Sequence, residues 1–165
     1  MTLADFTSPG LIIPRLRGKE AASAIKELSQ VLQMENRVPD VLPFYQAALN
    51  REFMASTDME AGMAFPHARV AGVKQVAFAL GRSEARLRWG LRAVTAVRLV
   101  FLIAVPATDS TQYLLLVSGL ARLSKENGLV EKLHTAQDTF QMMEVLRQVE
   151  LRTSAPPDAK RRAAR

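Results

Sequence analysis

The stretch "AVRLVFLIAVP" at residues 96–106 contains the most apolar run of this 165-residue chain. Its β-branched and aromatic residues indicate a strand, and its almost unbroken apolar centre is typical of a strand covered on both faces. That centre is far shorter than the roughly 20 apolar residues that a membrane span requires. A strand buried on both sides needs helices above and below it, so this stretch predicts a layered α/β fold.

The segments around this strand fit the same fold. A second strand is predicted at residues 73–83, "VKQVAFALGRS". Apolar residues at helical spacing predict helices over residues 18–33 and 39–55 before the strands and over residues 109–126, 127–136 and 136–150 after them. We therefore expect a single compact α/β domain, in which a mixed β-sheet is covered by helices on both faces.

The same spacing predicts which helical residues face the core. The expected inward residues are Ala22, Ile25, Leu28 and Leu32; Leu42, Tyr45, Ala48 and Leu49; Tyr113, Leu116, Val117, Leu120 and Leu123; and Phe140, Met143, Leu146 and Val149. Asp109 or Ser110 is the expected N-cap of the helix over residues 109–126.

Composition narrows the classes of site. The absence of cysteine excludes a disulfide, a thiolate nucleophile and a cysteine metal site, and the chain has only two histidines, His67 and His134. The first ten residues lack the basic and then hydrophobic layout of a secretory signal. We therefore expect a cytoplasmic protein with no membrane insertion, no metal and no cofactor.

The net charge of +6 is concentrated at the C-terminus. Residues 151–165 hold five Lys/Arg and one Asp, whereas residues 1–150 hold 17 basic and 15 acidic residues. We expect a folded domain over residues 1–152 and a basic, Pro/Ala-rich, disordered tail over residues 153–165. The folded part has no basic face with interleaved aromatics, so nucleic-acid binding is not predicted for it, although binding through the tail remains an alternative.

The stretch "GMAFPHARV" at residues 62–70 holds the first candidate functional residue. Pro66 has no N–H to donate, so we expect the strand to end at Pro66 and His67, with the chain leaving the sheet there. An imidazole at such a margin titrates near neutral pH and can act as a nucleophile or metal ligand. A lone histidine is more often structural, so further residues must decide.

Those further residues form a recognisable string. "NRE" at residues 50–52, "ST" at 56–57 and "GMAFPHAR" at 62–69 are followed by "VAFALGRS", "LRW", "VRLVFLIAVPA", "YLLLVSGLARL" and "LHTAQDTFQMMEVL". From about residue 18 to 149, the chain resembles the enzyme IIA domain of the bacterial phosphoenolpyruvate-dependent sugar phosphotransferase system. The likeness is to its type 2 branch, which includes fructose, mannitol and nitrogen-regulatory members.

The resemblance implies that His67 accepts a phosphoryl group from a phosphohistidine carrier protein (HPr-like). His67 would then pass it to a IIB component or use it as a regulatory signal. Such a protein is one component of a phosphotransferase rather than a self-contained enzyme. Arg51 matches the family's arginine near the site, and its planar fork of donors suits a phosphate. The alternatives for Arg51 are exposure to solvent or pairing with Glu52. Arg69 is expected to be solvated.

Three residues depart from the family pattern. Asp58 and Glu60 stand roughly where many members have glycines, and their carboxylates would oppose an incoming phosphate if they pointed inward. Tyr113 matches the position of a second family histidine; its phenol can donate to a phosphate oxygen but cannot become cationic. His134 does not match that position and is expected on the surface or in helix packing. These departures leave a second hypothesis open, a non-catalytic module that binds partner proteins without efficient phosphorylation.

Overall fold

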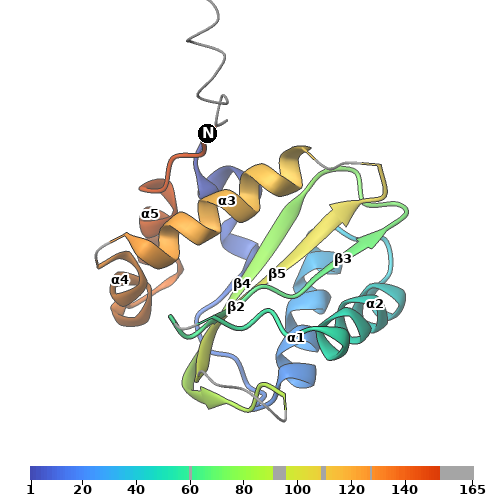
Figure 1. The fold of residues 1–165 in the computed structure, drawn as a ribbon, viewed down its shortest axis with the longest axis horizontal. Helices are drawn as coiled ribbons and strands as arrows, with labels where there is room; N and C mark the ends of the chain where they lie inside the picture. The colour runs from blue at the N-terminus through green and yellow to red at the C-terminus, as the bar shows by residue number, and fades with distance from the viewer. Residues whose placement is uncertain (60, 91–95, 109–110, 127, 153–165) are drawn as a thin grey trace, which may run out of the picture.

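The predicted apolar strand forms β5 (Val97–Pro106), which lies inside a five-stranded sheet in the computed structural model (Figure 1). Residues 99–105 are at most 1% exposed. Side chains alternate along a strand, so Leu99, Phe101 and Ile103 belong to one hydrophobic core, and Val100 and Leu102 belong to the other. The prediction of a strand buried on both faces is confirmed.

The structure describes residues 1–59, 61–90, 96–108, 111–126 and 128–152. Glu60, the predicted N-cap at Asp109 or Ser110, and the predicted tail over residues 153–165 lie outside these described residues. Hydrogen bonds join the first described residues to the last. The N–H of Leu3 donates to the carbonyl of Val149, and the N–H of Leu151 donates to the carbonyl of Met1. The first and last described residues therefore lie side by side.

The sheet is mixed, as predicted. β1 (Ile12–Ile13) pairs parallel with β4 (Ala77–Leu87), which pairs antiparallel with β5. On the other side of β5, β2 (Met63–Ala64) and β3 (His67–Val70) both pair with it in parallel. The strand predicted at residues 73–83 begins and ends four residues later, and the short β1 was not predicted, because two residues carry no periodicity.

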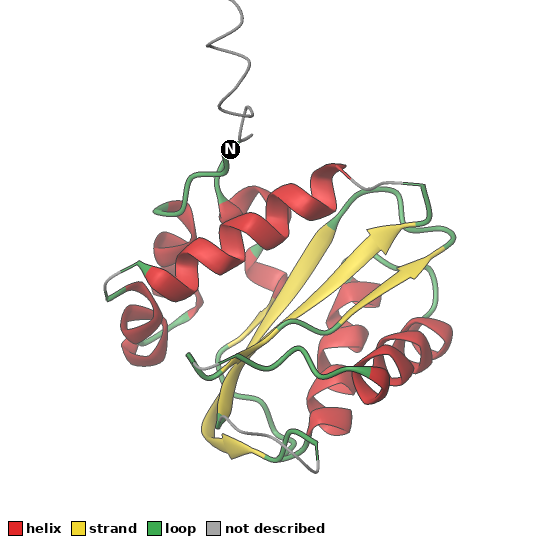
Figure 2. Ribbon diagram, in the orientation of Figure 1, coloured by secondary structure: helices red, strands yellow, loops and turns green. Residues whose placement is uncertain are grey.

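Helices cover both faces of the sheet (Figure 2). α1 (Ala21–Met34) and α2 (Val41–Met54) pack on one face, and α3 (Thr111–Lys125), α4 (Leu129–Thr135) and α5 (Thr139–Arg147) pack on the other with the 3-10 helix η1 (Leu3–Phe6). A second 3-10 helix, η2 (Pro9–Leu11), leads into β1. Among the described residues, no helix combines the length and apolarity needed to cross a bilayer.

Most predicted inward residues are buried, including Ile25, Leu28 and Leu32 of α1 and Leu116, Leu120 and Leu123 of α3. The predicted face of α2 was wrong at Leu42, which is 59% exposed. The buried residues of α2 are Phe44, Ala48 and Glu52, four positions apart. The inward face of α2 is therefore the one that carries Phe44, Ala48 and Glu52, and Leu42 lies on the outer face.

The predicted face of α5 was wrong at Phe140, which is 69% exposed. α5 begins only at Thr139, so Phe140 lies in its first turn. Met142, Met143, Val145 and Leu146 supply its buried contacts instead.

The buried Phe101 and the exposed Phe140 allow a matched test of the core. The ring of Phe101 lies 5.6 Å from that of Phe65 and 5.8 Å from that of Phe78, measured between centroids. We expect Phe101→Ala to lower the free energy of unfolding by about 3–5 kcal/mol. The exposed Phe140→Ala should change it by less than about 0.5 kcal/mol. Urea denaturation followed by circular dichroism measures both, and equal losses would contradict this description of the core.

Candidate functional site

The turn before β2 requires a glycine. Gly62 has a φ of +73°, a region that side chains rarely adopt, and a Cβ there would lie 2.9 Å from the carbonyl oxygen of Ala96. The carbonyl of Gly62 accepts hydrogen bonds from the N–H groups of Arg98 at 2.9 Å and Leu99 at 3.1 Å. This close approach ties the start of the "GMAFPH" segment to β5.

Pro66 interrupts the sheet edge without ending it. β2 ends at Ala64, and the chain rejoins β5 at His67, which pairs with Ile103. The expectation that the chain leaves the sheet at His67 was therefore wrong. Pro66 still accepts a hydrogen bond from the N–H of Ile103 at 2.9 Å, and on an edge strand its missing N–H leaves no partner unsatisfied. His67 thus begins a strand at the margin of the sheet.

The imidazole of His67 is half-buried and held in one orientation. Its Nδ1 lies 3.1 Å from the carbonyl oxygen of Phe65. A carbonyl oxygen can only accept, so this hydrogen bond places the proton of the neutral ring on Nδ1. The lone pair is then on Nε2, at the other side of the ring, which makes Nε2 the nucleophilic atom.

Tyr113 lies beside this ring. The centroids of the two rings are 5.5 Å apart, so the structure brings together two of the three site residues predicted from the sequence. Burial raises the pKa of the Tyr113 phenol above its usual value, and the positive charges of Arg51 and Arg69 oppose that rise. The phenol therefore stays protonated at neutral pH and can donate a hydrogen bond next to His67.

Both arginines that act on Tyr113 are held by main-chain carbonyls. Arg51 is exposed at the end of α2, where its Nη1 donates to the carbonyl of Ala55 at 3.2 Å. Arg69 lies two residues after His67 on β3, and its Nη1 donates to the carbonyl of Pro106 at 2.9 Å. Arg69 is exposed, as the sequence predicted, and this hydrogen bond also anchors its guanidinium at the site.

Glu52 does not pair with Arg51 but is buried beneath the site. Its carboxylate accepts hydrogen bonds from Trp89 Nε1 at 2.8 Å, from the N–H of Thr57 at 2.7 Å and from Thr57 Oγ1 at 2.9 Å. Because an unpaired buried carboxylate is costly, these donors fix the loop after α2 in place. The sequence analysis did not predict this role of Glu52. The spacing that could have indicated its burial is that Phe44, Ala48 and Glu52 follow one another at intervals of four residues.

Thr57 carries this network on to the histidine. Its Oγ1 donates to Glu52 and accepts from the N–H of Phe65 at 2.9 Å. The carbonyl of the same residue, Phe65, accepts from Nδ1 of His67. A continuous chain of hydrogen bonds therefore runs from Trp89 through Glu52, Thr57 and Phe65 to His67, and it sets the position of the ring.

The remaining candidates lie apart from this chain. The Asp58 carboxylate accepts a hydrogen bond from the Ser56 hydroxyl within the loop. His134 lies on α4, away from His67, and is half-buried. Within the described ranges, no three His, Cys, Asp or Glu side chains converge in a way that could hold a metal ion.

Known proteins are similar to this chain in sequence. Residues 5–149 match the family described as the phosphoenolpyruvate-dependent sugar phosphotransferase system, EIIA 2. The fructose-specific EIIABC component of Bacillus subtilis is 27% identical over 90% of this chain, which corresponds to 23% of that protein. The chain spans only about a fifth of the length of the first curated relatives that it matches.

Solved structures share the fold. Nitrogen regulatory protein IIA-Ntr from Neisseria meningitidis superposes with a TM-score of 0.72 at 23% identity, covering 87% of this chain and 98% of that one. IIA mannitol in complex with phosphorylated IIB mannitol, from Escherichia coli, has a TM-score of 0.70 at 17% identity and covers 84% of this chain and 95% of that one. With the family match over residues 5–149, the chain belongs to the EIIA 2 family of the phosphoenolpyruvate-dependent sugar phosphotransferase system.

Proposed function

We propose that this protein is a cytoplasmic phosphocarrier in which Nε2 of His67 accepts a phosphoryl group from an HPr-like phosphohistidine protein. The observation that carries the proposal is the hydrogen bond from His67 Nδ1 to the Phe65 carbonyl. This bond leaves the lone pair on Nε2, and the ring lies at a sheet margin beside the phenol of Tyr113, on whose pKa the positive charges of Arg51 and Arg69 act.

The transfer needs no proton to enter or leave the ring. The Nε2 lone pair of His67 attacks the phosphorus of the donor, a new N–P bond forms, and the N–P bond of the donor breaks. The proton stays on Nδ1, where the Phe65 carbonyl accepts it more strongly as the phosphorylated ring gains positive charge. Rate then depends on in-line positioning and on charge stabilisation.

The cations around the ring supply that charge stabilisation. Arg51 and Arg69 act on Tyr113 electrostatically, so their positive charges reach the space next to the His67 ring. A guanidinium fork matches phosphate oxygens, and the protonated phenol of Tyr113 adds a neutral donor. Asp58 opposes these groups, but it is engaged by Ser56.

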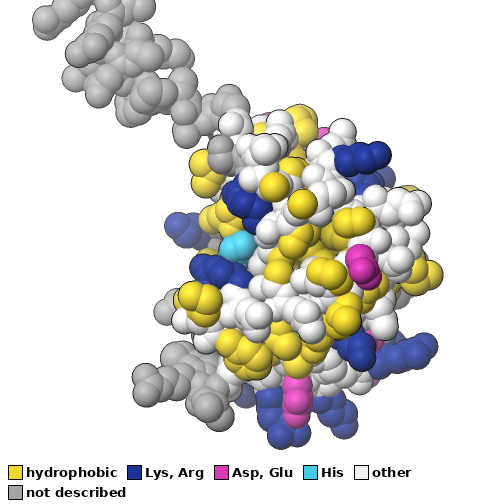
Figure 3. Space-filling view, turned by 90° about the vertical axis from the view of Figure 1, so that its right-hand side faces the viewer, with side chains coloured by type: hydrophobic (Ala, Val, Ile, Leu, Met, Phe, Trp, Pro, Cys, Tyr) yellow, Lys and Arg dark blue, Asp and Glu magenta, His cyan; other side chains and the backbone are white. Residues whose placement is uncertain are grey.

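The surface around the site suits docking of a protein partner. Phe53 is 76% exposed and Met54 is 83% exposed at the end of α2, two and three residues after Arg51, and Leu114 is 63% exposed directly after Tyr113. Figure 3 shows one face of the molecule, on which hydrophobic side chains gather beside basic ones. Apolar and basic side chains around a nucleophile suit an acidic, phosphorylated partner.

Two kinds of recipient fit this carrier. The IIA mannitol protein of Escherichia coli forms a complex with phosphorylated IIB, which supports a IIB component as one recipient. IIA-Ntr of Neisseria meningitidis is named a nitrogen regulatory protein, which supports a regulatory target as the other. The second candidate function is a binding module of the same fold without efficient phosphorylation, for which Tyr113 in place of a histidine and the carboxylate of Asp58 are the reasons.

Phosphorylation of His67 separates the two functions directly. We expect incubation with phosphoenolpyruvate, the first enzyme of the system and its carrier protein to add one acid-labile phosphate, because the N–P bond of phosphohistidine breaks readily in acid whereas the phosphate esters of Ser, Thr and Tyr do not. His67→Ala should abolish this gain, whereas His134→Ala should retain it. Intact-protein mass spectrometry measures both, and a wild-type protein that stays unmodified would favour the binding module.

Thr57 tests the hydrogen-bond chain beneath the histidine. Thr57→Val removes the hydroxyl that bonds Glu52 and Phe65, and we expect phosphorylation to become about ten- to a hundredfold slower because the His67 ring is no longer held. Thr57→Ser keeps the hydroxyl and should retain most of the rate. Quench-flow measurement of phosphohistidine formation decides, and equal rates in both variants would refute a positioning role.

Tyr113 tests the contribution of the phenol. Tyr113→Phe preserves the ring packing but removes the donor, so we expect phosphoryl transfer to slow roughly tenfold or more. Tyr45, the other tyrosine of the chain, lies on α2, and Tyr45→Phe provides the matched control with an unchanged rate. The same single-turnover assay measures both, and a Tyr113→Phe rate equal to wild type would remove the phenol from the mechanism.

A further inference from the structure

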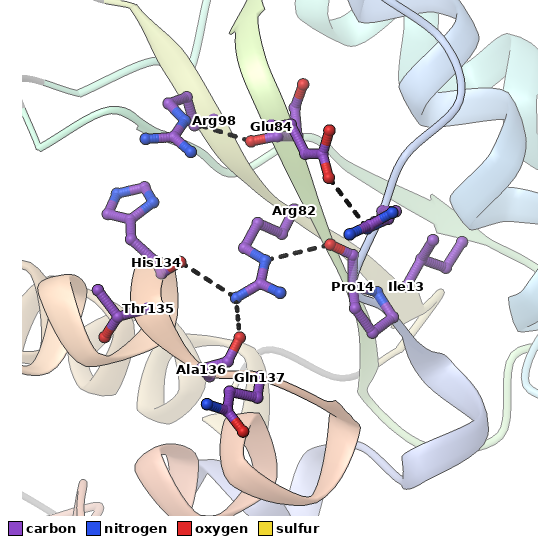
Figure 4. A pocket seen from close by; sticks show the side chains of 11 residues that line it. Ile13, Pro14, Arg82, Glu84, Arg98, His134, Thr135, Ala136 and Gln137 are labelled. Atoms are coloured by element: carbon purple, nitrogen blue, oxygen red, sulfur yellow. Dashed lines mark hydrogen bonds and ion pairs between the residues drawn. The ribbon is translucent and has the colours of Figure 1, made fainter.

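A cavity of about 660 Å³ opens between the segment after β1, the strands β4 and β5 and the end of α4 (Figure 4). This volume lies within the usual range for small-molecule pockets. Its charged lining consists of Arg15, Arg82, Arg98 and Glu84, beside the imidazole of His134. Three guanidinium groups against one carboxylate give the lining a formal net charge of +2 when His134 is neutral.

Arg82 is fixed at the back of this cavity. Its Nε donates to the carbonyl of Pro14 at 3.1 Å, and its Nη1 donates to the carbonyls of Leu133 at 2.7 Å and Ala136 at 2.6 Å. The carbonyls of Leu133 and Ala136 lie at the end of α4, where a cation is favoured by the helix dipole. Burial lowers the pKa of Arg82 below its usual value, and the positive charges of Arg98 and Arg15 lower it further.

Arg98 and Arg82 both keep unused donors. The hydrogen bond of Arg98 is made by Nε, which donates to the carbonyl of Ser83 at 3.2 Å. Among the residues that the structure describes, the Nη groups of Arg98 and Nη2 of Arg82 have no hydrogen-bond partner. Figure 4 shows both side chains at the cavity, with the His134 ring beside Arg98. Guanidinium groups with unused donors, in a cavity whose lining carries a net positive charge, are a binding arrangement for an oxyanion.

His134 supports the same conclusion. Its Nδ1 is buried and has no hydrogen-bond partner among the described residues. Burial lowers the pKa of this imidazole, Arg98 and Arg82 lower it further, and Glu131 opposes them. The ring is therefore neutral at neutral pH, and an anion bound beside it would raise its pKa.

The cavity is separate from the site at His67. Arg82 pairs with Leu99 on one side of β5, and His67 pairs with Ile103 on the other side. Leu99 and Ile103 are four residues apart, which is about 13 Å along a strand. One phosphate group cannot contact both sites.

We propose that this arginine cavity, lined by Arg15, Arg82, Glu84, Arg98 and His134, binds a small molecule that carries phosphate. The guanidinium forks match phosphate oxygens, and the volume leaves room for more than one phosphate group or for an attached organic group. The ligand would act as an effector or a second substrate, held apart from the phosphoryl acceptor.

Titration calorimetry with inorganic pyrophosphate, at constant ionic strength, tests the cavity in the full-length protein. We expect wild-type protein to bind and Arg98→Gln to bind at least tenfold more weakly, because the unpaired donors are lost. Glu84→Gln should bind severalfold more tightly, because it removes the carboxylate that pairs with Arg15 at 2.9 Å. Asp40→Asn makes the same change of charge at the start of α2 and should leave the affinity unchanged.

Two further measurements keep the outcome decisive. Arg51→Gln should retain pyrophosphate binding, since Arg51 belongs to the His67 site; loss of binding there would place the anion at His67 and overturn the proposal. Unchanged affinity in Arg98→Gln or the absence of binding to the wild type would overturn it as well. If Arg98→Gln does not fold, the exposed Arg15→Gln replaces it. In wild-type protein, NMR titration should show that pyrophosphate raises the pKa of His134, and an unaffected His134 would contradict binding in this cavity.

Discussion

The buried carboxylate of Glu52 is the constraint on which the geometry around His67 depends. A carboxylate that is 8% exposed must recover in hydrogen bonds what it loses in hydration, and each bond to a charged group contributes about 1.5–3 kcal/mol. Its donors come from Thr57 in the loop after α2 and from Trp89, two residues after the end of β4. One side chain therefore joins a helix, a loop and the sheet. Arg51 and Glu52 therefore differ in environment, since Arg51 is exposed at the end of α2 and Glu52 faces the interior.

β5 pairs with the strand that carries His67 and with the strand that carries Arg82, so it fixes the position of both residues. Its residues are buried on both faces, so its position is fixed by two cores rather than one. β2 and β3 pair along one side of it and place His67, whereas β4 pairs along the other side and places Arg82. Because both neighbours are registered to the same strand, neither site can shift without breaking pairs to β5. A rigid central strand with functional residues on its neighbours is a general way to hold reactive groups in place.

How far the sequence predicted this structure depends on the kind of signal. The long apolar run of β5 and the heptad-like spacing of α1 are strong signals, because burial on a known period leaves few alternatives. The resemblance to the family matched Tyr113 to a second histidine that faces the first, and the structure does place its ring 5.5 Å from that of His67. The face of α2 was misjudged because it carries a buried acid, and hydrophobic periodicity cannot register a charged residue that is stabilised by distant donors. Trp89 lies 37 positions from Glu52, and no local pattern predicts that contact.

The contacts of Arg82 explain why the proposed arginine cavity could not be predicted from the sequence. A lone arginine in a strand signals an exposed edge, yet here its guanidinium joins the carbonyls at the end of α4 to that of Pro14. The guanidinium of Arg82 both binds the carbonyls at the end of α4 and lines the cavity. A ligand that binds Nη2 and displaces this guanidinium would therefore weaken its hydrogen bonds to the end of α4. α3 ends at Lys125, shortly before α4 begins at Leu129, and its first turn holds Tyr113, whose ring lies 5.5 Å from that of His67. The α3–α4 layer and β5 are therefore the two elements that physically link His67 to the proposed arginine cavity.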